Sequence, residues 1–194
     1  MNKQPQLYVI AGPNGCGKTT FATEFLPNYV NCPTFINADT IARGLSGFSP
    51  NAVALKAGRI LLEQIETYAS KRKDFAFETT LSGMNYLSRF RDLKKEGYAI
   101  HLFFLWIPDV KLSLARVATR VKMGGHGIAE KVVRRRFHKG IKNFSDHYRQ
   151  VLDSWMLFDN SRDIPYRIAE QKSGELRIFD PERYARILNL AEEK

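Results

Sequence analysis

The sequence predicts an α/β fold in which helices flank a mostly parallel central β-sheet. Two observations carry this prediction. Short apolar segments alternate with longer segments of helical periodicity, and the first apolar segment leads directly into a glycine-rich loop. A chain of 194 residues, with 44% hydrophobic and 26% charged residues, can also build a real core. We therefore expect one domain over residues 1–194, without repeats, low-complexity tracts or linkers.

Short apolar runs predict the strands, because a strand buried on both faces is apolar throughout. The run that leads into the glycine-rich loop is the first, and a turn signal at Ser173-Gly174 separates the last two. The predicted strands are Leu7–Ala11, Thr34–Ile36, Phe75–Phe77, Ala99–Ile107, Pro165–Ala169 and Leu176–Phe179.

Segments with apolar residues at helical spacing predict the helices. We expect Pro27-Asn28 to stop the first helix, Gly97 to cap the fourth, and Asp180 to be the N-cap of the last. We also expect a break near Gly140 in the longest of the predicted helices. The predicted helices are Thr19–Leu26, Ile41–Leu45, Ala52–Ser70, Met84–Lys95, Val110–Lys122, Ala129 to about Leu157, and Pro181–Ala191, with breakers at Gly44, Gly47 and Pro50.

Positive charge is concentrated in one part of the chain. The net charge is +10, and the segment Lys111–Arg149 holds eleven Lys and Arg residues against Glu130 and Asp146. The rest of the chain is therefore nearly neutral. Such a concentration is expected where a polyanion is held, either a nucleic acid or a nucleotide together with a phosphorylated substrate.

Other features of the composition favour a cytoplasmic protein. The two cysteines, Cys16 and Cys32, form neither a disulfide framework nor a zinc pattern. The longest apolar run, Tyr98–Pro108, is shorter than the roughly 18 residues that a membrane span needs. The glycine-rich loop begins so early that we expect no signal peptide before it.

The strongest motif is the phosphate-binding pattern G-x-x-x-x-G-K-[ST], known as the P-loop. Its glycines let backbone N–H groups turn toward a phosphate, its lysine reaches the β- and γ-phosphates, and its hydroxyl ligates Mg²⁺. The preceding apolar strand and the following helix give the required context. We expect ATP or GTP to bind Gly12, Pro13, Asn14, Gly15, Cys16, Gly17, Lys18, Thr19 and Thr20, with Thr19 on the Mg²⁺ that accompanies the nucleotide.

The rest of the sequence narrows the class of P-loop protein. We find no suitably placed N-K-x-D or D-x-x-G motif of a GTPase, and no complete L-S-G-G-Q motif of a transport ATPase. The length, together with a basic segment after the fourth strand, suits a small-molecule kinase. We expect a lid at about residues 116–140 whose arginines close over ATP.

Several further motifs occur in a set order that resembles the zeta-toxin-like kinases. They span roughly residues 7 to 170: the P-loop through Thr20, Asn37-Ala38-Asp39, Phe77-Glu78-Thr79-Thr80-Leu81-Ser82, Arg120 with Gly124-Gly125-His126, Arg134-Arg135-Arg136-Phe137, and Asp159-Asn160-Ser161. The resemblance implies a cytoplasmic bacterial P-loop kinase. The best-known members phosphorylate the sugar of UDP-N-acetylglucosamine, some are toxins neutralised by an antitoxin protein, and many shorter relatives have no assigned substrate.

Two carboxylates follow neighbouring predicted strands, at the edge where open α/β sheets bind ligands. Asp39 is the candidate catalytic base, or a group that helps to hold Mg²⁺; a helix N-cap is the alternative. Glu78, with Thr79 and Thr80, is the candidate for binding the substrate or for an outer contact to Mg²⁺; a helix cap or a salt bridge is the alternative. Ser82 is a weaker candidate.

Transfer of a phosphoryl group needs one or two guanidinium groups to stabilise its charge. Arg116 and Arg120 share one helix face, whereas consecutive arginines point in different directions. We assign catalysis to Arg120 and Arg136 and substrate binding to Arg135, with a solvated basic face as the alternative. His126 is either a lid contact or a surface residue. The Asp159–Ser161 loop is either near the adenine, as the resemblance implies, or a plain turn.

Two functions follow. The first is an ATP-dependent kinase that phosphorylates a hydroxyl of a small metabolite, most favourably a nucleotide sugar. The second is a nucleic-acid-associated or regulatory ATPase that uses the basic 111–149 segment, with Phe137, Phe144 and Tyr148 stacking on bases. Because Phe137, Ile141 and Phe144 recur at helical spacing, a core role is favoured for them and a nucleic-acid partner is disfavoured.

Overall fold

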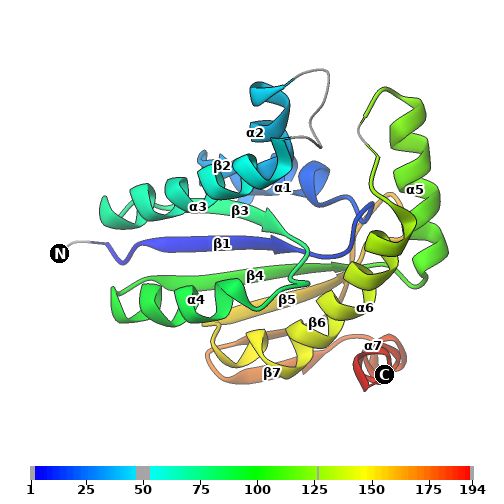
Figure 1. Cartoon of the computed structure of the whole chain (residues 1–194). Coiled ribbons are helices and arrows are strands. Elements are labelled where there is room, and N and C mark those ends of the chain that lie inside the picture. Colours follow the sequence, from blue (N-terminus) through cyan, green and yellow to red (C-terminus); the bar gives the residue numbers. More distant parts are fainter. Residues whose placement is uncertain (1–2, 47–52, 126, 193–194) are drawn as a thin grey trace.

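The computed structural model describes residues 3–46, 53–125 and 127–192, in which helices lie against a central sheet (Figure 1). The strands are β1 (Gln6–Ala11), β2 (Phe35–Ile36), β3 (Phe75–Thr79), β4 (Ala99–Trp106), β5 (Ser154–Asp159), β6 (Tyr166–Lys172) and β7 (Glu175–Ile178). The helices are α1 (Lys18–Tyr29), α2 (Ala38–Leu45), α3 (Ala54–Ser70), α4 (Asn85–Lys95), α5 (Val110–Lys122), α6 (Glu130–Asp146) and α7 (Pro181–Glu192), with a 3-10 helix at Tyr148–Gln150.

The sheet has the predicted mostly parallel character. Its order is β2-β3-β1-β4-β5-β6-β7. The strands β2, β3, β1, β4 and β5 run parallel, whereas β6 is antiparallel to both of its neighbours, β5 and β7. The register pairs Ile10 with Glu78 and Ala11 with Thr79. The P-loop after β1 and the polar end of β3 therefore meet at the same edge of the sheet.

Successive residues of β4 show how helices cover both faces. Phe103 contacts Phe21 and Phe25 of α1, whereas Phe104 stacks on Phe144 of α6. Because neighbouring side chains of a strand point to opposite faces, α1 and α6 lie on opposite sides of the sheet. This aromatic core holds both helices in place relative to the P-loop.

The predicted helix from Ala129 to about Leu157 is wrong in its C-terminal part. The helix α6 ends at Asp146, and the residues Ser154–Asp159 form the parallel strand β5 beside β4. Burial along β5 alternates, with Trp155 and Leu157 buried. This period of two is a strand pattern, which the apolar residues of the preceding helix obscure in the sequence.

The expected break near Gly140 is also wrong, because α6 runs through it without interruption. A Cβ on Gly140 would lie 2.5 Å from the carbonyl oxygen of Thr80. The glycine therefore lets α6 approach the segment that follows β3. Asn143 donates a hydrogen bond to the Leu81 carbonyl at 2.7 Å, and Tyr148 donates one to the Gly83 carbonyl at 2.8 Å, so both secure the same segment.

Two of the three predicted helix-end signals are confirmed. Asp180 accepts a hydrogen bond from the backbone N–H of Arg183 and caps α7, and Gly97 has the expected positive φ of 90° after α4. Pro27, however, lies inside α1, which continues to Tyr29. Because this proline removes a hydrogen bond only in the last turn, it does not end the helix at once. The expectations for Gly47, Pro50, Ala52 and His126 lie outside the described residues.

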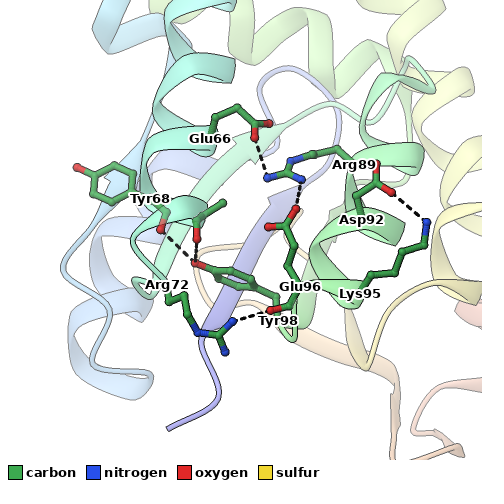
Figure 2. A network of polar contacts seen from close by, with 9 residues as sticks. Glu66, Tyr68, Arg72, Arg89, Asp92, Lys95, Glu96 and Tyr98 are labelled. Atoms are coloured by element: carbon green, nitrogen blue, oxygen red, sulfur yellow. Dashed lines mark hydrogen bonds and ion pairs between the residues drawn. The ribbon is translucent and has the colours of Figure 1, made fainter. Parts of the chain in front are cut away.

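A polar network fixes the C-terminal end of α3, which lies at the edge of the sheet away from the P-loop (Figure 2). Arg89 of α4 bridges Glu66 of α3 and Glu96, at 2.8 and 2.7 Å. The hydroxyl of the buried Tyr98 lies among main-chain carbonyls at the end of α3, within hydrogen-bond distance of those of Tyr68 at 3.2 Å and Lys73 at 2.9 Å. The orientation of α3 across the sheet is therefore set at this end.

None of the helices in the described part of the chain is long and apolar enough to span a membrane.

Candidate active site

The P-loop between β1 and α1 has the conformation of an anion cradle. Gly12, Gly15 and Gly17 have φ angles of 143°, 74° and 89°, which side chains rarely tolerate. Gly17 lies directly before α1 and acts as its N-cap. The positive end of the α1 dipole therefore points toward the loop, where it favours a phosphate.

Lys18 is buried and folds back over the loop. Its Nζ donates hydrogen bonds to the carbonyl oxygens of Gly12 at 3.0 Å and Pro13 at 2.9 Å. These neutral oxygens orient the ammonium group without cancelling its charge. The positive charge thus remains available to a bound anion, as the P-loop motif predicts.

Thr19 connects the P-loop to the next strand. Its hydroxyl donates to Oε2 of Glu78 at 2.8 Å, and Nδ2 of Asn37 lies 3.5 Å from the same hydroxyl. A hydroxyl beside a carboxylate suits Mg²⁺, which takes few protein ligands and keeps phosphate and water oxygens. The described residues contain no group of three His, Cys, Asp or Glu that could hold a metal ion. The donors thus fit a magnesium ion whose other ligands come from a nucleotide and water.

Asp39 lies in the first turn of α2, but it is not the N-cap. The cap is Asn37, whose Oδ1 accepts from the backbone N–H groups of Asp39 and Thr40. The Asp39 carboxylate therefore does not serve as the helix cap. Its Oδ2 lies 3.9 Å from Nη1 of Arg120, and both side chains are partly exposed.

Arg136 of α6 reaches the same site. Burial and the neighbouring charge of Arg135 lower the pKa of the Arg136 guanidinium, and the carboxylate of Asp39 opposes that shift. Arg136 is thus a half-buried cation close enough to Asp39 to feel its charge. Two arginines from different helices, Arg120 and Arg136, thus lie at the same site as Asp39.

These groups surround a cleft of about 490 Å³, a volume typical of small-molecule sites. Its walls come from the P-loop, the ends of β3, and helices α2 to α6. The lining residues are Asn14, Gly15, Gly17, Lys18, Thr19, Thr20, Ala38, Asp39, Ala42, Ala54, Gly58, Leu61, Glu78, Thr79, Thr80, Tyr86, Arg116, Arg120 and Arg136.

Some predicted site residues lie outside this lining. Gly12, Pro13 and Cys16 belong to the P-loop but are buried, and burial raises the pKa of the Cys16 thiol. Arg135 is exposed on α6 and is not among the residues around the cleft, so the structure does not bring it to the predicted substrate site. Arg134 is also exposed and pairs with Glu130 at 2.6 Å.

Arg116 holds a loop that is distant in the sequence, a contact that its spacing from Arg120 does not reveal. Its guanidinium donates to the carbonyl oxygens of Asn160 at 2.9 Å and Ser161 at 2.8 Å, in the loop after β5. Asn160 in turn donates to the Cys16 carbonyl of the P-loop at 2.6 Å. The Asp159–Ser161 loop is thus part of the support of the P-loop.

Several residues of the cleft are not predicted from the sequence. Ala54, Gly58 and Leu61 of α3, and Tyr86 of α4, line it without belonging to a recognised motif. The spacing of the first three, at i, i+4 and i+7, indicates a shared helix face, but it does not say what that face meets.

Comparison with protein families gives one match that covers most of the chain. The family model described as Zeta toxin matches residues 1–182. An uncharacterized protein of Haemophilus influenzae is 33% identical over 126 residues, which are 65% of this chain and 88% of that protein.

Solved structures show the same fold at low sequence identity. The AvrRxo1-ORF1:ORF2 complex with ATP gives a TM-score of 0.78 at 21% identity over 96% of this chain. This chain spans only 64% of the length of the matched chain. The PezAT toxin–antitoxin system of Streptococcus pneumoniae gives a TM-score of 0.65 at 14% identity, over 99% of this chain and 89% of the matched chain.

Proposed function

Because the chain belongs to the zeta toxin family, we propose that it is an ATP-dependent kinase that phosphorylates a hydroxyl group of a small metabolite. One observation carries the proposal. The cleft places an anion cradle, a carboxylate and two arginines around a single space. Phosphoryl transfer needs this combination, because it depends on positioning and on stabilisation of charge.

The donor side of the cleft would hold the triphosphate. The N–H groups of the P-loop and the ammonium of Lys18 bind phosphate oxygens, and Thr19, supported by Glu78 and Asn37, would hold Mg²⁺. The metal ion supplies neutralisation of phosphate charge when it is bound. In the structure, Lys18 donates to main-chain carbonyls, so it exchanges these contacts for phosphate oxygens on binding.

The acceptor side would carry out the transfer. The carboxylate of Asp39 accepts the proton of the attacking hydroxyl, whose oxygen forms a bond to the γ-phosphorus while the bond to ADP breaks. Arg120 and Arg136 stabilise the negative charge on the transferring group. Glu78, Thr79 and Thr80, at the end of β3, position the acceptor.

We favour a nucleotide sugar such as UDP-N-acetylglucosamine as the acceptor and the cytoplasm as the location. The support is the family resemblance together with the size of the cleft. An antitoxin is the proposed protein partner. The solved neighbours support it, because the PezAT structure is of a toxin–antitoxin system.

The proposal is tested by incubating the purified protein with MgATP and a panel of nucleotide sugars and nucleosides, with mass-spectrometric detection of products. We expect one acceptor to gain one phosphate, and a Lys18→Ala variant to give none. Replacing ATP with GTP in parallel reactions measures the donor preference. A folded protein that neither binds nucleotide with Mg²⁺ nor phosphorylates any member of the panel would contradict the proposal.

The alternative, a nucleic-acid-dependent ATPase, loses its stacking platform. Phe137, Phe144 and Tyr148 are only 2%, 3% and 0% exposed, so the expected core role is confirmed and these rings are not available to bases. Stimulation of ATP hydrolysis by RNA or DNA, with a steep dependence on salt, would restore this alternative.

A further inference from the structure

One face of α3 forms an apolar wall of the candidate active site. Ala54, Gly58 and Leu61 line the cleft and follow each other at helical spacing. Tyr86 of α4 also lines the cleft. Its ring contacts those of Phe77 and Phe90, with centroids 5.0 and 6.2 Å apart, which fixes its orientation.

Gly58 is unusual in this wall because nothing in the described part of the chain requires a glycine there. A Cβ at this position would meet no atom of the described residues within 4 Å, apart from its own helix backbone. Its φ angle is outside the positive range that favours glycine. A glycine in the interior of a helix lowers stability relative to alanine. The missing side chain thus leaves space in the cleft at a cost to the helix.

A second observation indicates that this cleft accommodates a polar ligand. Asn14 lines it and is only 9% exposed, and its Oδ1 atom has no hydrogen-bond partner among the described residues. A buried amide oxygen without a donor is costly. A hydroxyl or N–H group of a bound molecule would satisfy it.

We propose that Gly58 is a specificity-determining residue, which leaves room for an uncharged, hydroxyl-bearing ring of the acceptor to lie flat against the backbone of α3. The apolar wall of Ala54 and Leu61 suits the face of a sugar or nucleoside ring, and the charged groups, Asp39, Arg120 and Arg136, line the same cleft. This inference rests on the proposed kinase function, and it adds where the acceptor ring lies and which residue limits its size.

The test enlarges the side chain stepwise, with Gly58→Ala and Gly58→Leu. Gly44 of α2 provides matched controls, Gly44→Ala and Gly44→Leu, since its Cβ would also meet nothing within 4 Å but it does not line the cleft. Both alanine variants should raise the Tm by about 2–4 °C through helix propensity. A lower Tm for Gly58→Ala would show that the added methyl group clashes with its surroundings, which would contradict the open space beside Gly58.

Binding is measured by calorimetry with UDP-N-acetylglucosamine, uridine and adenosine as probes, in the presence of a non-hydrolysable ATP analogue. We expect Gly58→Leu to weaken binding of the ring-bearing probe by at least about tenfold, and Gly58→Ala to weaken it less. The affinity for the ATP analogue should not change. The Gly44 variants should bind like the unaltered protein.

Failures of the two proposals can be told apart. If the unaltered protein phosphorylates an acceptor, but the Gly58 and Gly44 variants show the same acceptor KM, the kinase function stands and the role of Gly58 is wrong. If a probe binds and Gly58→Leu excludes it, but no phosphate is transferred, the subsite stands and the kinase function is wrong. If the unaltered protein binds none of the probes, the class of ligand assigned here is wrong.

Discussion

At the scale of single residues, the role proposed for each charged group depends on the groups that lie next to it. Lys18 meets only neutral carbonyls in the hydrogen bonds described above, whereas Asp39 lies near Arg120 and Arg136. This difference supports the proposal that Lys18 serves the donor phosphates and Asp39 the acceptor hydroxyl.

The role of Asp39 predicts a variant that binds nucleotide without using it. Asp39→Asn keeps the shape of the side chain but removes the base, so we expect kcat to fall by about 10²- to 10⁴-fold. The Kd for ATP, measured by calorimetry, should stay the same. Asp92→Asn, on the surface of α4, is the control. Undiminished turnover by Asp39→Asn would remove Asp39 from the mechanism.

Arg135 and Arg136 are adjacent in the sequence, and replacing either one with glutamine changes the net charge by the same amount. Arg136 lines the cleft and Arg135 does not. We expect Arg136→Gln to lower kcat/KM by about 10²- to 10³-fold through loss of a donor to the transferring group. Arg135→Gln should have little effect. Equal losses in steady-state assays would instead show that the overall positive charge, rather than the position of Arg136, is responsible.

Motifs in the sequence predict several of the residues that the structure places around the cleft. Lys18, Thr19, Asp39 and Glu78 were named from their motifs and line the cleft. The sequence could not rank the arginines of α6 securely, because the rotation of a helix about its axis is set by tertiary packing. It also offered no signal for Gly58, whose role depends on the space around it.

At the scale of elements, the P-loop is held in place by a loop far away in sequence. Asn160, after β5, donates to the carbonyl of Cys16, and Arg116 of α5 fixes the backbone around Asn160. This arrangement requires β5 to lie in the sheet beside β4. The sequence predicts a helix up to about Leu157, which covers most of β5, so the Asp159–Ser161 motif can be recognised in it but its contact with the P-loop cannot.

Asn160→Asp should loosen this support. The new carboxylate cannot donate and would face the Cys16 carbonyl, so we expect a loss of about 1–3 kcal/mol in the free energy of unfolding. The affinity for ATP should also fall, because the P-loop is less well ordered. Denaturant unfolding and calorimetry measure both effects.

The matched control is Asn28→Asp at the end of α1, which also loses an amide donation to a main-chain carbonyl, that of Glu24 at 2.7 Å. This bond is exposed and lies at the other end of α1 from the P-loop. It should leave the affinity for ATP unchanged. If both variants bind ATP equally well, Asn160 has no part in shaping the nucleotide site.

At the scale of the whole molecule, buried tyrosines make stability depend on high pH. Burial raises the pKa of Tyr98 to about 12, from a usual value of 10.0, and that of Tyr148 likewise to about 12. Between pH 10 and 12 these groups ionise in the unfolded chain but stay neutral in the folded protein. The stability that they contribute is thus complete below pH 10 and is lost as the pH rises through 12.

Tyr98→Phe tests this dependence. The variant removes the hydroxyl that donates to the Lys73 carbonyl at 2.9 Å, so we expect lower stability at neutral pH. Its free energy of unfolding should, however, fall less steeply between pH 10 and 12 than that of the unaltered protein. Tyr29→Phe is the control, since Tyr29 is 77% exposed. Parallel pH profiles for Tyr98→Phe and the unaltered protein would contradict the prediction.

The network in Figure 2 has a consequence for motion, because it secures α3 at the end away from the active site. A helix held at its C-terminal end moves by rotation about that end, so displacement grows toward Ala54 and Gly58. Amide hydrogen exchange should then be slowest near Tyr68 and faster in the N-terminal turns of α3. A ligand lying against Gly58 would slow amide exchange most in those N-terminal turns. The exchange rates along α3 would therefore show whether the site is occupied.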